Sequence, residues 1–175
     1  MAAFIDTVFL NGTVGVGKST VADIVSELKA LAGQPHALID LDYLRTCWPA
    51  PENDPFNFAL ELANLTSVVD NYRRAGIEHL ILVGVAETAD AVEKYREATH
   101  SPDLLMCRLT AQPAIVAERL RRRHRDDPAG LDWHLARATE LASILDAAEI
   151  DDVVLDTTSA GPTDVARSVM SAAEW

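Results

Sequence analysis

Apolar and polar residues alternate in two different spacing patterns along this chain. Short, almost wholly apolar runs indicate buried strands, and longer stretches with an apolar residue every three or four positions indicate amphipathic helices. The expected strands cover residues 7–10, 36–39, 79–85, 104–109 and 153–155. The expected helices cover residues 18–32, 56–75, 89–98, 113–124, 131–145 and 162–173.

Strands and helices alternate throughout, interrupted by the three prolines of residues 48–55 and by the Asp-Asp-Pro-Ala-Gly segment at 126–130. Such alternation with apolar strands is typical of an α/β protein, in which helices cover both faces of a parallel sheet. The 175 residues suit a single domain over residues 1–175, since neither a linker nor an internal repeat interrupts the pattern. We therefore expect a five-stranded parallel sheet, with functional residues just beyond the carboxyl ends of its strands.

Residues 12–19 read Gly-Thr-Val-Gly-Val-Gly-Lys-Ser and match the pattern GxxxxGK[ST]. The match follows an apolar strand and opens a helix, a context that a glycine-rich turn matching by chance would not share. Glycines let backbone N–H groups approach phosphate oxygens, Lys18 would reach the β- and γ-phosphates, and the Ser19 hydroxyl would coordinate Mg²⁺. The motif therefore predicts nucleotide binding by Gly12, Thr13, Val14, Gly15, Val16, Gly17, Lys18, Ser19 and Thr20.

The second expected strand is followed by Asp40-Leu-Asp42-Tyr-Leu-Arg45. In an extended segment Asp40 and Asp42 point to the same side. Beside the phosphate loop, one carboxylate can accept a proton from a substrate hydroxyl and the other can hold a Mg²⁺-bound water. Arg45 can bind an anionic group of a substrate. The alternative is that the two aspartates cap a helix or form a turn, as aspartate often does after a strand.

With these segments the chain resembles the small P-loop kinases that phosphorylate metabolites or drugs. Residues 10–12 through Lys18 and Ser19, followed by Asp42, look like the chloramphenicol phosphotransferases, and residues 40–45 are similar to the DGDNxR segment of adenylylsulfate kinases. Leu41 replaces the glycine of that segment and Tyr43 its asparagine. The resemblance implies a three-layer P-loop NTPase fold of the nucleoside-monophosphate-kinase type, ATP as phosphate donor, and Asp42 as the base that activates the acceptor hydroxyl. Asp40 is then left as the Mg²⁺ ligand acting through water.

Five arginines lie between positions 119 and 125, at the end of the helix after the fourth strand. Arg119 and Arg123 are four residues apart and therefore share one helix face. The resemblance places a lid over residues 119–131 and implies that both side chains stabilise the transition state at the phosphates. The alternative is a solvated basic face that complements the negative end of the helix dipole.

Other candidate residues carry weaker signals. Glu87 follows the third strand and can contact substrate or metal-bound water, although acidic residues also favour helix starts. Arg137 lies where related nucleotide kinases direct an arginine to the transferred phosphate, and a surface arginine fits equally well. The loop that begins at Thr157 resembles the segment around adenine in these kinases. An apolar substrate pocket or a core could be formed by Trp48, Phe56, Phe58 and Trp133.

Charge and cysteine content exclude several partners. The net charge of −12, from 15 basic and 27 acidic residues, argues against a nucleic-acid partner. No apolar run approaches the roughly 20 residues that a membrane-spanning helix needs. The two cysteines are far apart and the five histidines form no HExxH motif, so a zinc site has no support. Residues 1–6 hold no basic segment ahead of an apolar one, so we expect a cytoplasmic protein without a secretory signal.

The leading hypothesis is an ATP- and Mg²⁺-dependent phosphotransferase acting on a hydroxyl of a small-molecule acceptor, as a monomer or homodimer. A regulatory GTPase would carry an NKxD segment, which the sequence lacks. A P-loop ATPase without an acceptor usually has two acidic residues after a long apolar strand, whereas the third strand here is followed by Glu87 alone. Together with a nucleotide-binding regulatory protein, that ATPase stays open as the alternative.

Overall fold

The computed structural model describes residues 5–175, so the prediction about residues 1–6 falls largely outside the described residues. Its strands are β1 (Thr7–Asn11), β2 (His36–Asp40), β3 (His79–Val83), β4 (Leu105–Thr110) and β5 (Val153–Asp156). Its helices are α1 (Lys18–Leu31), α2 (Leu41–Arg45), a 3₁₀ turn (Pro55–Asn57), α3 (Phe58–Arg74), α4 (Ala89–Thr99), α5 (Pro113–Arg123), α6 (Pro128–Ala148) and α7 (Pro162–Ala172). All strands pair in parallel in the order β2-β3-β1-β4-β5, which confirms the predicted five-stranded parallel sheet.

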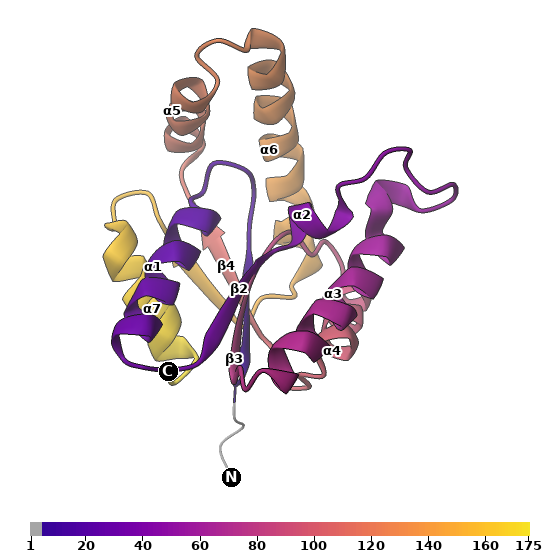
Figure 1. Ribbon diagram of the computed structural model, residues 1–175. Coiled ribbons are helices and arrows are strands. Elements are labelled where there is room, and N and C mark those ends of the chain that lie inside the picture. Colours follow the sequence, from indigo (N-terminus) through magenta and orange to yellow (C-terminus); the bar gives the residue numbers. More distant parts are fainter. Residues whose placement is uncertain (1–4) are drawn as a thin grey trace.

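The sheet is buried between two apolar layers because successive side chains of a strand point to opposite faces. In β1, Val8 and Leu10 pack into one cluster with α1 and α7, whereas Phe9 packs into the other with α3 and α4. Figure 1 shows the same division, with α1 and α7 on one side of the strands and α3 and α4 on the other. This two-sided burial explains why the central strands read as continuous apolar runs.

Three local predictions differ from the structure. The chain turns into the short helix α2 directly after Asp40, so the extended segment ends at Asp40 and does not continue to Asp42. Phe56 has a φ of 58°, which excludes it from α3. Gly130 lies inside α6, because Pro128 starts that helix and the Asp127 side chain accepts a hydrogen bond from the Gly130 N–H. The break expected at 126–130 therefore lies at residues 124–127, between the end of α5 and the start of α6.

The carboxyl ends of the strands meet at one edge of the sheet, and the chain is elaborated there. The loop after β1 lies at this edge, and α5 together with the first half of α6 extends beyond it (Figure 1). The segment predicted as a lid, residues 119–131, comprises the end of α5, the connection and the first turn of α6. Among the described residues, none of the helices is long and apolar enough to cross a membrane.

Candidate functional site

The loop between β1 and α1 has a backbone that only glycine permits at its first position. Gly12 has a φ of 134°, and a Cβ there would lie 2.4 Å from the carbonyl oxygen of Leu109 in β4. Gly17 has a φ of 102° and precedes the first turn of α1, and a Cβ there would have open space around it. The first glycine thus packs the loop onto the sheet, and the last leaves room at the helix N-terminus, where phosphates bind.

Lys18 bends back over this loop. Its Nζ donates hydrogen bonds to the carbonyl oxygens of Gly12, at 2.6 Å, and Thr13, at 3.0 Å. Burial lowers the pKa of Lys18 from 10.5 to about 8, and the negative charges of Asp42 and Asp40 partly oppose that shift. The cation is therefore held inside the loop, facing two carboxylates across the cavity, where a phosphate group would complete its surroundings.

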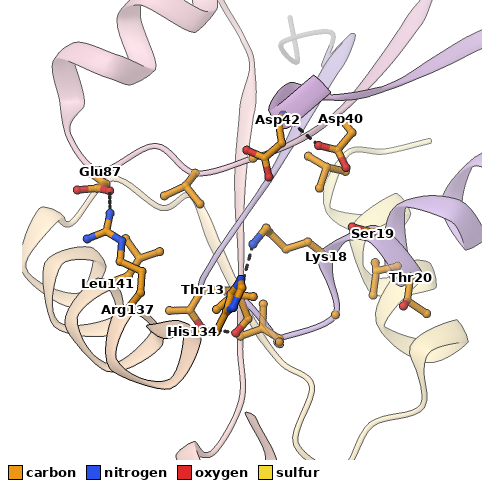
Figure 2. A pocket seen from close by; sticks show the side chains of 18 of the residues that line it. Thr13, Lys18, Ser19, Thr20, Asp40, Asp42, Glu87, His134, Arg137 and Leu141 are labelled. Carbon is orange, nitrogen blue, oxygen red and sulfur yellow. Dashed lines mark hydrogen bonds and ion pairs between the residues drawn. The ribbon is translucent and has the colours of Figure 1, made fainter. Parts of the chain in front are cut away.

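The hydroxyl oxygens at the start of α1 are suitable ligands for Mg²⁺ that is bound together with a nucleotide. The Ser19 and Thr20 side chains stand at the start of α1, next to the cavity (Figure 2). Within residues 5–175, no group of three histidine, cysteine or acidic residues is arranged to hold a metal ion by itself. Mg²⁺ usually keeps several waters and takes only one or two protein ligands beside phosphate oxygens, so these few donors fit it.

Asp40 and Asp42 face the cavity from the end of β2 and the start of α2. The Asp40 side chain accepts a hydrogen bond from the backbone N–H of Asp42 at 3.1 Å and caps α2. The expectation that an extended backbone aligns the two carboxylates is therefore wrong, but the turn still brings both to the cavity wall. The Asp42 side chain is 85% exposed and points toward the space beside the Lys18 Nζ (Figure 2).

Arg45 follows on α2 and reaches a buried partner that the sequence analysis missed. Its Nη2 forms an ion pair with Glu61 of α3, and the Tyr95 hydroxyl of α4 donates to the other Glu61 oxygen at 2.6 Å. Burial raises the pKa of Glu61, although Tyr95 and Arg45 both favour its charged form. A signal was present in the sequence, because Glu61 precedes the buried Leu65 and Val69 by four and eight residues on the apolar face of α3.

Glu87, which lies between β3 and α4, meets Arg137 of α6. The Arg137 Nη2 on α6 donates to a Glu87 oxygen at 2.5 Å (Figure 2). Its Nη1 donates to Glu140 at 2.9 Å. The two neighbouring carboxylates raise the pKa of Arg137. Sequence analysis selected Glu87 and Arg137 separately, and the structure joins them in one ion pair on the cavity wall.

Arg119 of α5 forms hydrogen bonds to the phosphate loop and to the loop after β5. Its guanidinium donates to the carbonyl oxygens of Gly15 and Val16, at 3.3 and 3.2 Å. It also donates to the hydroxyl of Thr157 at 3.0 Å and to the Thr157 carbonyl oxygen at 2.8 Å. Arg119 thus ties the phosphate loop to the loop after β5, whereas Arg122 and Arg123, one turn further along α5, have no ion pair among the described residues.

A cavity of about 1080 Å³ joins these groups. Apart from Gly12, the first residue of the loop, every predicted site residue lines this cavity. Of the aromatic candidates, Phe56, Phe58 and Trp133 lie on its wall, whereas Trp48 is 93% exposed and lies elsewhere. Another part of the wall, on the side of the phosphate loop, is formed by Thr157 and Ala160 of the loop after β5 and by Pro162, which begins α7.

Comparisons with known proteins agree with this architecture. A family profile described as "AAA domain" matches residues 8–158. The comparison with curated proteins found no match. Among solved structures, the chain is similar to a gluconokinase from Sinorhizobium meliloti, with 20% identity, a TM-score of 0.64, and coverage of 98% of this chain and 93% of that one.

Two further solved structures share the fold. A shikimate kinase from Acinetobacter baumannii in complex with shikimate has 17% identity and a TM-score of 0.66, over 96% of this chain and 92% of that one. The APS kinase of Mycobacterium tuberculosis in complex with AMPPNP and APS has 22% identity and a TM-score of 0.60, over 99% of each chain. The predicted resemblance to P-loop kinases of small molecules is thus confirmed at the level of the fold.

Proposed function

The chain belongs to the AAA domain family, and we propose that it is a phosphotransferase that moves the γ-phosphate of ATP to a hydroxyl of a small-molecule acceptor. One observation carries this proposal: the ammonium group of Lys18 and the carboxylate of Asp42 face each other across one cavity, with space between them (Figure 2). A phosphate bound by the loop would lie between a cation that holds it and a base that faces it.

In this proposal the phosphate loop and Lys18 hold the triphosphate, and Asp42 accepts the proton of the acceptor hydroxyl. The hydroxyl oxygen then forms a bond to the γ-phosphorus while the bond to the β-γ bridging oxygen breaks, which releases ADP. Mg²⁺, held by Ser19 and by Asp40 through water, would neutralise charge on the phosphates. Alcohols are too weakly acidic to attack unaided, so a carboxylate within hydrogen-bonding distance supplies the proton acceptor that the reaction needs.

The arginines take separate roles in this proposal. Arg123 lines the cavity, belongs to no ion pair among the described residues and lies close enough to Lys18 to lower its pKa. We therefore assign it to the charge that develops on the transferred phosphoryl group. Arg119 bonds to the backbone of the phosphate loop and contributes by holding that loop in place. The donor is taken as ATP because the APS kinase that shares this fold was solved with AMPPNP.

The proposal is tested by an ADP-release assay over a panel of sugars, nucleosides, amino alcohols and hydroxylated antibiotics, each with Mg²⁺-ATP and compared with a reaction that lacks an acceptor. Once an acceptor is found, Asp42→Asn should lower acceptor-dependent turnover by about a hundredfold or more. ATP affinity should stay the same, because Asp42 contacts the acceptor and not the nucleotide. Unchanged turnover would exclude Asp42 as the base.

A matched variant separates the base from the neighbouring carboxylate. Asn caps helices as well as Asp does, so Asp40→Asn keeps the cap of α2 and removes one charge. We expect it to raise the Mg²⁺ concentration required for turnover and to retain most of the rate at saturating Mg²⁺. ADP release of equal rate with and without every acceptor, unaffected by Asp42→Asn, would favour an ATPase instead.

A further inference from the structure

The cavity has two halves, which differ in whether their positively charged side chains are paired with carboxylates. The nucleotide half is formed by the phosphate loop and the end of α5. The acceptor half is formed by Asp42 and Arg45 of α2, Phe58 of α3, Glu87 before α4, Lys94 of α4 and Arg137 of α6. Of its three cations, Arg45 was predicted from the sequence to bind an anionic group of a substrate, and Arg137 to reach the transferred phosphate.

In the acceptor half every cation already has a carboxylate partner. Arg45 pairs with the fully buried Glu61, and Lys94 pairs with Asp90 at 2.6 Å. Arg137 pairs with Glu87 at 2.5 Å on the cavity side and with Glu140 at 2.9 Å. The positive charges of this half are therefore neutralised by the protein itself.

The nucleotide half shows the opposite arrangement. Within residues 5–175, no ion pair joins Lys18, Arg122 or Arg123 to a carboxylate. Lys18 donates only to carbonyl oxygens. Cations gathered without a directly paired carboxylate favour an anionic ligand, which a triphosphate supplies. The same fold thus leaves its cations free where phosphate is expected and neutralises them where the acceptor is expected.

An anionic acceptor would compete with these carboxylates for the same cations. If the anionic group drew Arg45 away from Glu61, that carboxylate would stay buried and charged without a counter-ion, which is strongly destabilising. If the anionic group drew Arg137 away from Glu87, the negative charge of Glu87 would face that group and repel it. Asp42 and Asp40 add two more negative charges to the same wall. The electrostatic balance of this half therefore disfavours a carboxylate, sulfate or phosphate group.

We propose, on the basis of the phosphotransferase function above, that the acceptor presents a hydroxyl to Asp42 and carries no anionic group, so that it is a neutral or amine-bearing alcohol. The carboxylates supply hydrogen-bond acceptors for its hydroxyl or amino groups. Phe56, Phe58 and Trp133 supply apolar surface for its carbon skeleton. In this assignment Glu87 is a specificity residue, because it occupies the guanidinium that an anionic acceptor would need.

Binding of an anion tests the proposal without requiring turnover. Protein saturated with Mg²⁺-AMPPNP, which blocks the phosphate loop, is titrated with sulfate by calorimetry. Glu87→Gln frees one side of Arg137 and should bind sulfate at least about tenfold more tightly than the wild type does. Glu140→Gln is the matched control, because Glu140 pairs with the same arginine but does not line the cavity, and sulfate affinity should stay at the wild-type level.

Turnover provides the second measurement. Glucose, glucosamine and glucuronate share one skeleton and differ in charge, and a nucleoside and its monophosphate form a second matched set. We expect acceptor-dependent ADP release to be confined to the neutral and amine-bearing members. Preference for an anionic member, or wild-type sulfate affinity equal to that of Glu87→Gln, would overturn the proposal. Absence of turnover with all probes, combined with the expected sulfate result, would count against the phosphotransferase function and leave the charge assignment standing.

Discussion

The two halves of the cavity are built by different means. The centre of the nucleotide half comes from the contiguous residues 13–20, where the backbone of the phosphate loop contributes to the binding surface, and the end of α5 lies beside it. The acceptor half comes from separate elements that tertiary packing brings together, as when Glu87 and Arg137 pair across 50 residues of sequence. A site formed by backbone groups depends on a few glycines. A site formed by side chains depends on which charged groups the fold brings into contact. Substitutions should therefore affect the two halves in different ways.

The largest effect is expected where the backbone itself builds the site. Gly12→Ala places a Cβ 2.4 Å from the Leu109 carbonyl oxygen at a φ of 134°. Relieving that clash requires β1 and β4 to move apart, so we expect the free energy of unfolding to fall by about 3–5 kcal/mol. Nucleotide binding should be lost with it. Urea unfolding followed by circular dichroism measures the first effect, and fluorescent-nucleotide titration measures the second.

Gly33→Ala is the matched control. Gly33 also has a positive φ, of 68°, but a Cβ there would meet no atom within 4 Å. Its cost should be limited to the left-handed backbone, about 1–2 kcal/mol, with nucleotide affinity retained. Equal losses of stability for the two variants would mean that close packing against β4 does not hold the phosphate loop in place.

This difference between the halves also explains what the sequence predicted. The periodic pattern located every strand and every long helix, and the spacing of the motif located the phosphate loop, because both are local properties. The helix α2 was not among the expected helices because five residues are too few to show a helical period, although helix capping by these aspartates was the alternative interpretation. The ion pairs of Arg45 and Arg137 were missed because each depends on the position of a helix elsewhere in the fold.

A smaller effect is expected in the acceptor half. Glu61→Gln keeps the shape of the side chain but leaves Arg45 without its counter-charge. We expect the free energy of unfolding to fall by about 2 kcal/mol. The Michaelis constant for the acceptor should change by about tenfold while nucleotide affinity stays the same, because the phosphate loop has no contact with this pair. Chemical denaturation and steady-state kinetics measure the two effects.

Two controls accompany Glu61→Gln. Tyr95→Phe removes the hydroxyl that donates to Glu61 but keeps the carboxylate opposite Arg45, so the acceptor Michaelis constant should change less. Glu93→Gln removes a surface ion pair with Arg96 on α4 and should change stability by less than about 1 kcal/mol. A loss of nucleotide affinity in Glu61→Gln equal to its effect on the acceptor would show that the two halves are not separable.

The smallest effect is expected at the junction between the phosphate loop and the loop after β5, which the hydrogen bonds of Thr157 and Arg119 form. Thr157→Val keeps the shape of a buried side chain but removes its hydrogen bonds to the Val16 carbonyl oxygen, at 2.8 Å, and from Arg119, at 3.0 Å. We expect a loss of about 1 kcal/mol in stability and a weakening of nucleotide binding by less than about tenfold. The acceptor Michaelis constant at saturating ATP should not change. Thr139→Val, which removes an exposed hydroxyl bonded only within α6, should alter none of these quantities. If Thr157→Val instead changed the acceptor Michaelis constant, the junction would position both halves, and the separation between a backbone-built and a side-chain-built half would fail there.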